Sequence, residues 1–317
     1  MNERIWAYLI HLGENMWSDT NQSRMGGYAN WDYAPSYRDH LLCDDATWDK
    51  LVAELPKLGV NTLVVDVGDG IQFESHPELA IQGSWSKEKL EKKLSEARAL
   101  GMNVVPKLNF SACHDTWLKE YSRMLSTQPY YKVVRDLITE TAELFGHPSL
   151  FHLGMDEENA PLQASYEYTV VRGFGLWWHD LGVMTRACED AGCRPWVWSD
   201  KYWSHPKEFA ENMSKEVLQS NWYYGSEFGY DVGHECCRAS ASFKELDELG
   251  YDQVPTGSNW ECHQNMELLG RFCSENIAPE RLKGFMTAPW CFTIPREYYR
   301  LLDGASRLND VRENLKQ

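Results

Sequence analysis

The sequence predicts an α/β chain that folds as one (β/α)8 barrel, a TIM barrel, over residues 1–317. Two observations support this prediction: a helix–glycine–strand pattern recurs along the chain, and eight apolar segments of strand length lie between amphipathic segments. A barrel of this kind takes about 250 residues before loop insertions, so a single domain accounts for the whole chain. No linker or low-complexity tract divides the sequence.

The recurring pattern is an amphipathic helix followed by a Leu-Gly or Ala-Gly pair and then an apolar segment. A helix end favours a left-handed residue at its C-terminal cap, and glycine adopts that conformation without strain. The chain can then turn directly into the next strand. The pattern occurs at Leu58-Gly59, Leu100-Gly101, Ala191-Gly192 and Leu249-Gly250, with Phe145-Gly146 as a near variant.

The strands are expected near residues 5–12, 61–67, 103–109, 149–154, 194–199, 216–222, 252–258 and 283–290. Between them, Ser86 is a suitable N-cap for a helix that ends at Gly101, and Pro129 fits the first turn of a helix that ends at Gly146. Residues 13–42 are polar and rich in Trp and Tyr, which predicts a long first βα loop that is functional or disordered. An open doubly wound sheet is the alternative fold, although no GxGxxG follows the first strand.

The composition argues against a nucleic-acid-binding or membrane protein. The chain carries 31 basic and 47 acidic residues, a net charge of −16, and an acidic surface repels phosphate backbones. A neutral carbohydrate is compatible with this charge. No apolar run approaches the roughly 20 residues of a membrane span, and no signal-peptide pattern precedes the first strand. We therefore expect a cytoplasmic protein, with a secreted form after processing as the alternative.

Polar and indole side chains gather where the predicted strands end, which is where barrel enzymes hold their active sites. In chain order these side chains are His11, Glu14, Asn15, Asp66, Asp69, Asn109, His114, His152, Asp156, Glu157, Trp198, Asp200, Trp222, Trp260, Glu261 and Trp290. Indole faces stack on the C–H faces of a pyranose and exclude water, so the set favours a sugar site. For each tryptophan taken singly, a cap on the barrel core is the alternative interpretation.

Residues 151–159 carry the candidate chemistry. Because side chains alternate along a strand, His152, Gly154 and Asp156 are expected to face the barrel interior, and Glu157 can turn toward the same cavity. Adjacent carboxylates oppose each other's ionisation, so a partly enclosed Glu157 should have a raised pKa, as a general acid requires. Glu158 is interpreted as part of a solvated acidic loop.

No metal and no cofactor are expected. A divalent-metal site at the strand-four carboxylates would need a second acidic cluster, for which only Asp66 and Asp69 are available. Nine cysteines are present without paired CxxC motifs, and the His-Glu-Cys-Cys run at 234–237 is a weak zinc pattern. Buried free thiols in a reducing compartment are the preferred interpretation of the cysteines.

The stretch from His152 to Glu157 resembles the His-x-Gly-x-Asp-Glu pattern of family 20 glycoside hydrolases, the β-N-acetylhexosaminidases. Further segments are similar in the same order: Pro106-Lys107-Leu108-Asn109 and His114 to the family's third-strand Pro-Glu-Ile-Asp and Gly-His, Trp198-Ser199-Asp200 to its Trp-x-Asp, and Trp222 to its sixth-strand Trp. The resemblance covers residues from about 100 to 222.

The resemblance implies that Glu157 is the general acid/base and that Asp156 orients a substrate 2-acetamido group. The carbonyl oxygen of that group would attack the anomeric carbon in place of an enzyme nucleophile. His114 and His152 would support the site, and Trp198, Trp222 and Trp290 would wall the sugar. The strand-end residues Asn109, Asp200, Trp260 and Glu261 complete the predicted substrate-binding set.

The chain also departs from the family pattern. The family's first-strand Arg has no counterpart in residues 11–14, Trp260 stands in place of a Tyr, and the acid after the last-strand Trp is missing after Trp290. Two alternatives therefore stay open: a retaining glycosidase in which Glu261 is the nucleophile, and a sugar-binding barrel without catalysis. The sugar, its linkage, exo or endo action and the oligomeric state are also open.

Overall fold

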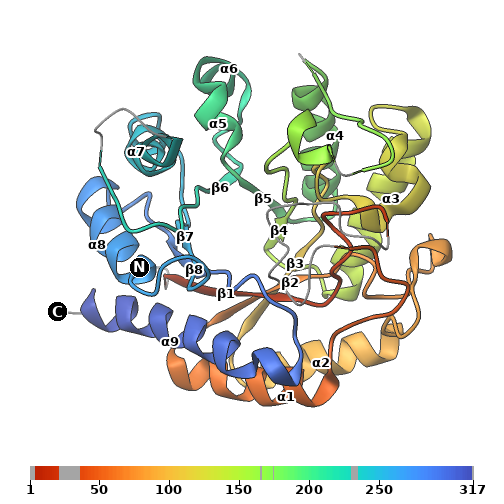
Figure 1. The fold of residues 1–317 in the computed structure, drawn as a ribbon, viewed down its shortest axis with the longest axis horizontal. Coiled ribbons are helices and arrows are strands. Elements are labelled where there is room, and N and C mark those ends of the chain that lie inside the picture. Colours follow the sequence, from red (N-terminus) through yellow and green to blue (C-terminus); the bar gives the residue numbers. More distant parts are fainter. Residues whose placement is uncertain (1–3, 21–35, 165, 174, 230–234, 316–317) are drawn as a thin grey trace.

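The computed structural model describes residues 4–20, 36–164, 166–173, 175–229 and 235–315, and these form a barrel of parallel strands surrounded by helices (Figure 1). The eight expected strands are all present, mostly shorter than the sequence suggested. They are β1 (Ile5–His11), β2 (Thr62–Asp66), β3 (Asn103–Lys107), β4 (Leu150–His152), β5 (Arg194–Trp198), β6 (Leu218–Ser220), β7 (Thr256–Gly257) and β8 (Gly284–Thr287).

The sheet is closed, which confirms the barrel and removes the doubly wound alternative. Its order is β6-β5-β4-β3-β2-β1-β8-β7, with every neighbouring pair parallel. The two end strands are joined by backbone hydrogen bonds: Val254 N donates to Gln219 O at 2.8 Å, and Thr256 N donates to Asn221 O at 2.9 Å. An open sheet would leave these edge groups unpaired.

Helices follow the strands around the outside of the barrel (Figure 1). The α-helices are α1 (Asp45–Glu54), α2 (Lys87–Ala99), α3 (Gln128–Leu144), α4 (Leu176–Asp190), α5 (Lys201–Ser204), α6 (Pro206–Asn212), α7 (Glu235–Glu248), α8 (Asn265–Asn276) and α9 (Tyr298–Asn314). Short 3₁₀ helices are η1 (Leu55–Leu58), η2 (Pro77–Leu79), η3 (Thr116–Arg123), η4 (Ala160–Gln163) and η5 (Pro295–Glu297). A bilayer-spanning helix is not found in the described part of the chain.

The local signals in the sequence act as expected. The Ser86 side chain accepts a hydrogen bond from Lys89 N at the start of α2, and Pro129 lies in the first turn of α3. The glycines that follow the helices in the recurring pattern all have positive φ, as does the near variant: Gly59, Gly101, Gly146, Gly192 and Gly250. Left-handed glycines therefore end these helices just before the next strand begins.

Side chains alternate between two apolar cores. Along β1, Tyr8 and Ile10 pack outward into the large core between strands and helices, while Ala7 and Leu9 belong to a smaller cluster inside the barrel. The interior cluster also contains Trp196 and Trp198 of β5, both fully buried. Indoles therefore fill the inside of the barrel beneath the C-terminal ends of the strands, where they close the bottom of any ligand site at that end.

Candidate active site

A cavity of about 1610 Å³ opens where the strands end. Of the residues predicted to act in catalysis or substrate binding, all but two line it: Asn109, His114, Asp156, Glu157, Asp200, Trp222, Trp260, Glu261 and Trp290. Side chains from β3, β4, β5, β6, β7 and β8 or the loops after them thus meet at one end of the barrel. This is the position at which barrels with this topology build ligand sites.

The exceptions, His152 and Trp198, lie beneath the cavity. His152 is fully buried, its ring centre is 4.6 Å from that of Trp198, and its Nδ1 accepts a hydrogen bond from Gly154 N at 3.0 Å. Burial lowers the pKa of His152 well below its usual value, so the ring is neutral. Trp198 in turn lies 6.1 Å from Trp290, which does line the cavity. Both residues therefore lie below the residues that line the cavity, and they do not contact a ligand bound in it.

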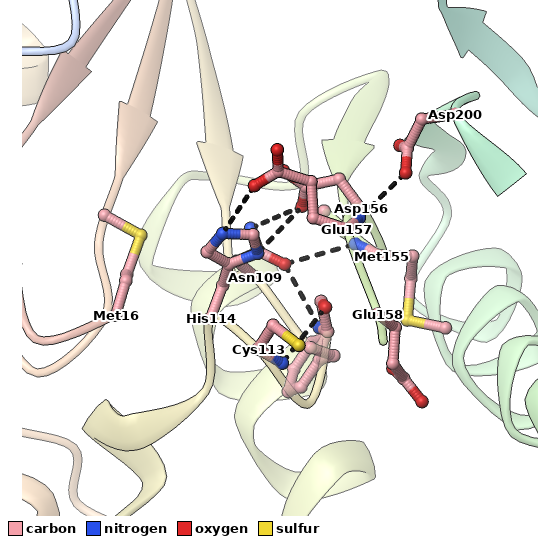
Figure 2. Close-up of polar contacts among 12 residues, drawn as sticks. Met16, Asn109, Cys113, His114, Met155, Asp156, Glu157, Glu158 and Asp200 are labelled. Carbon is pink, nitrogen blue, oxygen red and sulfur yellow. Dashed lines mark hydrogen bonds and ion pairs between the residues drawn. The ribbon is translucent and has the colours of Figure 1, made fainter. Parts of the chain in front are cut away.

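The backbone after β4 does not continue as a strand, so the expectation that strand alternation aims Asp156 is wrong. The strand ends at His152, and Gly154, Met155 and Glu157 have φ values of +69°, +76° and +55°. Left-handed conformations cost a non-glycine residue about 1–3 kcal/mol, and they persist where the surroundings enforce them. The turn directs both Asp156 and Glu157 toward His114 (Figure 2).

Asn109, at the end of β3, holds this turn. Its Oδ1 accepts a hydrogen bond from Met155 N at 3.1 Å, and its Nδ2 donates to Asp156 Oδ1 at 2.8 Å. A Cβ atom at Gly154 would lie only 2.0 Å from Asn109 Oδ1, so no residue but glycine fits without displacing the amide. The glycine of the strand-four motif is therefore needed for close packing as well as for its backbone angle.

His114 bridges the two acidic residues. Its Nδ1 lies 3.4 Å from Asp156 Oδ1, and its Nε2 lies 3.3 Å from Glu157 Oε2 (Figure 2). Burial alone would lower the pKa of His114, but the charge of Asp156 and the contacts with both carboxylates raise it to about 10. Burial likewise favours a neutral Asp156, yet His114, Lys107 and Asn109 hold its pKa well below the usual range. The pair is therefore an imidazolium and a carboxylate at neutral pH.

Asp200, shortly after β5, is an acidic residue in the cavity wall with a raised pKa. Its Oδ2 accepts a hydrogen bond from Glu157 N at 2.8 Å, and its Oδ1 accepts a longer one from Trp222 Nε1 at 3.4 Å. Burial and the nearby charge of Asp156 raise the pKa of Asp200 to about 7. Asp200 thus secures the left-handed backbone of Glu157 from the opposite side to His114 (Figure 2).

Glu158 is not part of a solvated loop, and that interpretation is wrong. Its side chain is only 1% exposed and forms a two-point ion pair with Arg172, with Nε to Oε1 at 2.9 Å and Nη2 to Oε2 at 2.6 Å. Ala112 N donates to the same carboxylate at 3.0 Å, and Arg172 also approaches Asp180 of α4 at 3.4 Å. Burial of an acid is tolerated here because a buried guanidinium neutralises it.

Sequence reasoning did not select several residues that line the cavity: Trp17, Arg38 and Tyr224. Trp17 lies 6.1 Å from His114 and 6.4 Å from Trp290, ring centre to ring centre. It belongs to the long first loop, whose Trp and Tyr content was the available signal; residues 21–35 of that loop lie outside the described part. Asn15 fastens the loop by donating to Asp69 Oδ2 and to Arg38 O, both at 2.7 Å.

One group in the described part of the chain has the geometry to hold a metal ion, namely His114, Asp156 and Glu157, whose donor atoms lie within 4.8 Å of one another. The group fits poorly, because each nitrogen of His114 already faces a carboxylate and the ring would have to lose a firmly held proton to bind a metal. Asp66 is likewise engaged, by Lys107. The His-Glu-Cys-Cys run at 234–237 lies outside the side chains that the structure describes.

No protein-family model matches the sequence. No curated protein matches it either. Solved structures do match the fold. A family 20 exo-β-N-acetylglucosaminidase from Vibrio harveyi, in complex with N-acetylglucosamine, has a TM-score of 0.61 at 14% identity and covers 99% of this chain. The pneumococcal virulence factor StrH scores 0.63 at 13% identity over 98% of the chain, and a β-N-acetylhexosaminidase from Bacteroides fragilis scores 0.61 at 13% over 96%.

The share of the matched structures that this chain spans varies. It spans 57% of the Vibrio harveyi chain and 65% of the Bacteroides fragilis chain, but 85% of the pneumococcal one. At these identities the likeness concerns the fold, and it extends over nearly all of this chain. In its fold, the chain is similar to the barrels of solved structures named as family 20 glycoside hydrolases.

Proposed function

We propose that the protein is a glycoside hydrolase that cleaves a β-linked, N-acetylated hexosamine by substrate-assisted catalysis. Glu157 is the general acid/base, and Asp156 orients the 2-acetamido group. The observation that carries the proposal is the pair of adjacent carboxylates at the end of β4, turned into one cavity and bridged by His114. The fold likeness to family 20 enzymes supports the same assignment.

Asp156 has the properties needed to act on an acetamido group. It is buried and ionised, and both of its contacts described above, with His114 and Asn109, use Oδ1. Oδ2 is then available to accept the N–H of the substrate. That hydrogen bond orients the acetamido carbonyl oxygen toward the anomeric carbon, and the carboxylate charge stabilises the positive oxazolinium ring that forms.

Glu157 has the exposure that proton transfer to a substrate requires. Its side chain is 38% exposed and lines the cavity, in contrast to its buried neighbours Asp156 and Glu158. As the acetamido oxygen bonds to the anomeric carbon, the bond to the leaving oxygen breaks and Glu157 gives that oxygen its proton. Water then opens the oxazolinium ring and returns a proton to Glu157. The two successive displacements at the anomeric carbon retain its configuration.

Aromatic rings enclose the space beside these groups. Trp17 and Trp290 pack against each other, and Trp17 also contacts His114 while Trp290 contacts His11. Trp222 stacks on Tyr224 at 5.1 Å, and Tyr224 in turn lies 6.3 Å from Trp290. Such rings bind the apolar faces of a pyranose and exclude water from the developing charge. Residues Trp260 and Glu261 line the rim and are assigned to sugar binding.

The test is a Glu157→Gln variant assayed on glycosides of N-acetylglucosamine and N-acetylgalactosamine. A methyl glycoside needs protonation of its leaving oxygen, so its kcat/KM should fall by a factor of about 10²–10⁴. A glycoside with a nitrophenolate leaving group should lose much less, because that group departs without a proton. Equal losses on both, or none on either, would remove Glu157 from the proposed role. An oxazoline-mimicking thiazoline should inhibit the wild-type enzyme.

Glu261 supports a second candidate, because it lines the same cavity as Glu157. In that scheme Glu261 attacks the anomeric carbon and forms a covalent intermediate, as in most retaining glycosidases. Glu261→Ala would then abolish turnover and azide would restore it, whereas Asp156→Ala would be mild. Substrate assistance predicts the reverse order of losses and no azide rescue. Sugar binding without hydrolysis of any glycoside would instead favour a non-catalytic binding protein.

A further inference from the structure

Arginines gather in one corner of the cavity, although the chain as a whole carries a net charge of −16. In the described part of the chain, the charged residues that line the cavity from the first loop and from the segment after β8 are three arginines and two glutamates: Arg38, Arg296, Arg300, Glu14 and Glu297. We call the three arginines the arginine corner. The proposed mechanism uses none of these five side chains, so it does not account for the charge of the corner.

The arginine corner adjoins the aromatic rings that are assigned to the sugar. Trp290 lies 6.4 Å from Trp17, ring centre to ring centre, and Cys291 follows it directly in the cavity wall. Burial raises the pKa of the Cys291 thiol, and the charges of Arg300 and Glu14 also act on it, so both side chains lie close to Cys291. A sugar that packs on Trp290 therefore has this corner beside it.

Arg38 is fixed at both its backbone and its side chain. Its N–H donates to Asn15 Oδ1 at 2.8 Å, and its carbonyl oxygen accepts from Asn15 Nδ2 at 2.7 Å. Its guanidinium lies over the ring of Phe292, 5.2 Å from the ring centre. Thr293 in turn ties this segment to β1, because its Oγ1 donates to His11 O at 2.8 Å. A guanidinium held in this way loses little conformational entropy when a ligand binds it.

Arg300, on α9, lines the cavity without a counter-ion. Its half-buried guanidinium forms no ion pair or hydrogen bond with any residue that the structure describes, whereas Arg238, elsewhere in the cavity wall, pairs with Glu245 at 2.9 Å. Burial raises the pKa of Glu14 to about 7, so this acid cancels little of the positive charge below that pH. Glu297 is the other acid that opposes it. Three arginines against two glutamates therefore leave an excess of positive charge that suits an anion.

We propose that the arginine corner binds an acidic substituent on the N-acetylated hexosamine, either a sulfate ester or a carboxylate. The inference rests on the proposed function, because the rings beside the corner are those assigned there to the sugar. Sulfate and carboxylate oxygens match the fork of N–H groups that a guanidinium presents. A neutral hexosamine would leave Arg300 without a counter-charge. The substrate class is thus a β-glycoside of an acidic N-acetylated hexosamine.

The experiment compares neutral and acidic substrates that share one leaving group. They are the 4-nitrophenyl β-glycoside of N-acetylglucosamine, its three mono-O-sulfate esters, and the corresponding uronide, in which the primary alcohol is replaced by a carboxylate. One acidic substrate should exceed the neutral one in kcat/KM by about tenfold at low ionic strength, and high salt should reduce the excess. Preference for an ester identifies sulfate as the bound group, and preference for the uronide identifies a carboxylate.

Variants of the corner link this preference to its residues. Arg300→Gln should remove most of the tenfold excess, and Arg38→Gln should reduce it. Arg300→Lys should retain part, because it keeps the charge but not the two-point geometry. Arg238→Gln is the matched control, since it removes a paired arginine from the same cavity wall, and it should leave the ratio of acidic to neutral kcat/KM unchanged.

Two results would overturn the proposal. One is a wild-type protein that prefers no acidic substrate over the neutral one, and the other is a preference that survives both Arg300→Gln and Arg38→Gln. If none of the glycosides is hydrolysed, the proposed function fails for N-acetylglucosamine, and calorimetric titration with the free sugars then tests the corner alone. Tighter binding of an acidic sugar that Arg300→Gln abolishes would support the corner without the hydrolase, whereas equal binding of acidic and neutral sugars would refute it.

Discussion

Gly154→Ala is expected to lower both the stability of the protein and its activity, because it strains the backbone and displaces Asn109 in the site. The glycine has a φ of +69°, and a Cβ atom there would lie 2.0 Å from Asn109 Oδ1 and 2.7 Å from Asn109 Cα. The second contact is with backbone, so the new methyl group cannot be accommodated by a side-chain rotation alone. Asn109 must move, and it is the residue that donates to Asp156 Oδ1 at 2.8 Å.

The size of the effect follows from two terms. A left-handed alanine costs about 1–2 kcal/mol, and crowding in a packed region costs about 1–3 kcal/mol more. The sum of about 2–5 kcal/mol should lower the melting temperature by roughly 3–8 °C in a protein of this size. Turnover should fall further than the folded fraction does, because the displaced amide no longer holds Asp156.

Gly101→Ala provides the matched control. Its φ is +88°, but no atom lies within 4 Å of the position that a Cβ would take. It should therefore show the conformational cost of about 1–2 kcal/mol without the crowding term, and its activity should be normal. Calorimetry and kcat measured well below both melting temperatures provide the comparison. If Gly154→Ala is no less stable than Gly101→Ala and equally active, the close packing of Asn109 on the strand-four turn is refuted.

Three further predictions concern buried charges. Arg172→Met should destabilise the protein by about 3–5 kcal/mol in urea unfolding, since it leaves Glu158 buried and unpaired, and adding Glu158→Gln should recover much of that loss; no recovery would contradict the assignment. The pKa of His114 is raised from 6.5 to about 10, so its stabilising contribution is complete below pH 6.5 and is lost as pH rises toward 10. The unfolding free energy of the wild type should fall more steeply over that range than that of His114→Gln, and parallel curves would disprove this. The pKa of Asp200 is raised from 3.8 to about 7, so its ionisation opposes folding, and stability should decline from pH 4 to 7 in the wild type but less in Asp200→Asn; an unchanged slope would contradict the raised pKa.

Most of the fold was predictable because local signals determine it. Left-handed glycines end the helices, Ser86 and Pro129 begin two of them, and apolar segments between them form the strands. These signals need no knowledge of distant contacts. Closure of the barrel depends on pairing between the β6 and β7 segments, and one sequence does not show which strands pair, so an open sheet stayed an alternative.

Those site residues that lie shortly after a strand could be predicted from the sequence. Residues such as Asp200 and Trp222 could be placed because the strands before them were recognised. The direction of Glu158 could not, since its burial depends on Arg172, fourteen positions later in the chain, and on a turn with positive φ. Trp17 was missed for a related reason: it contacts His11, His114 and Trp290, and the local sequence does not reveal these distant contacts.

The three consecutive acids after β4 are not interchangeable. Asp156 faces His114 from a buried position, Glu157 faces the cavity, and Glu158 neutralises Arg172 behind it. Deleting one residue from this run would leave two carboxylates for three environments, and either the imidazolium or the guanidinium would lose its counter-charge. Stability and catalysis therefore both depend on the spacing of residues 156–158. We expect insertions and deletions among related chains to occur only beyond Asn159.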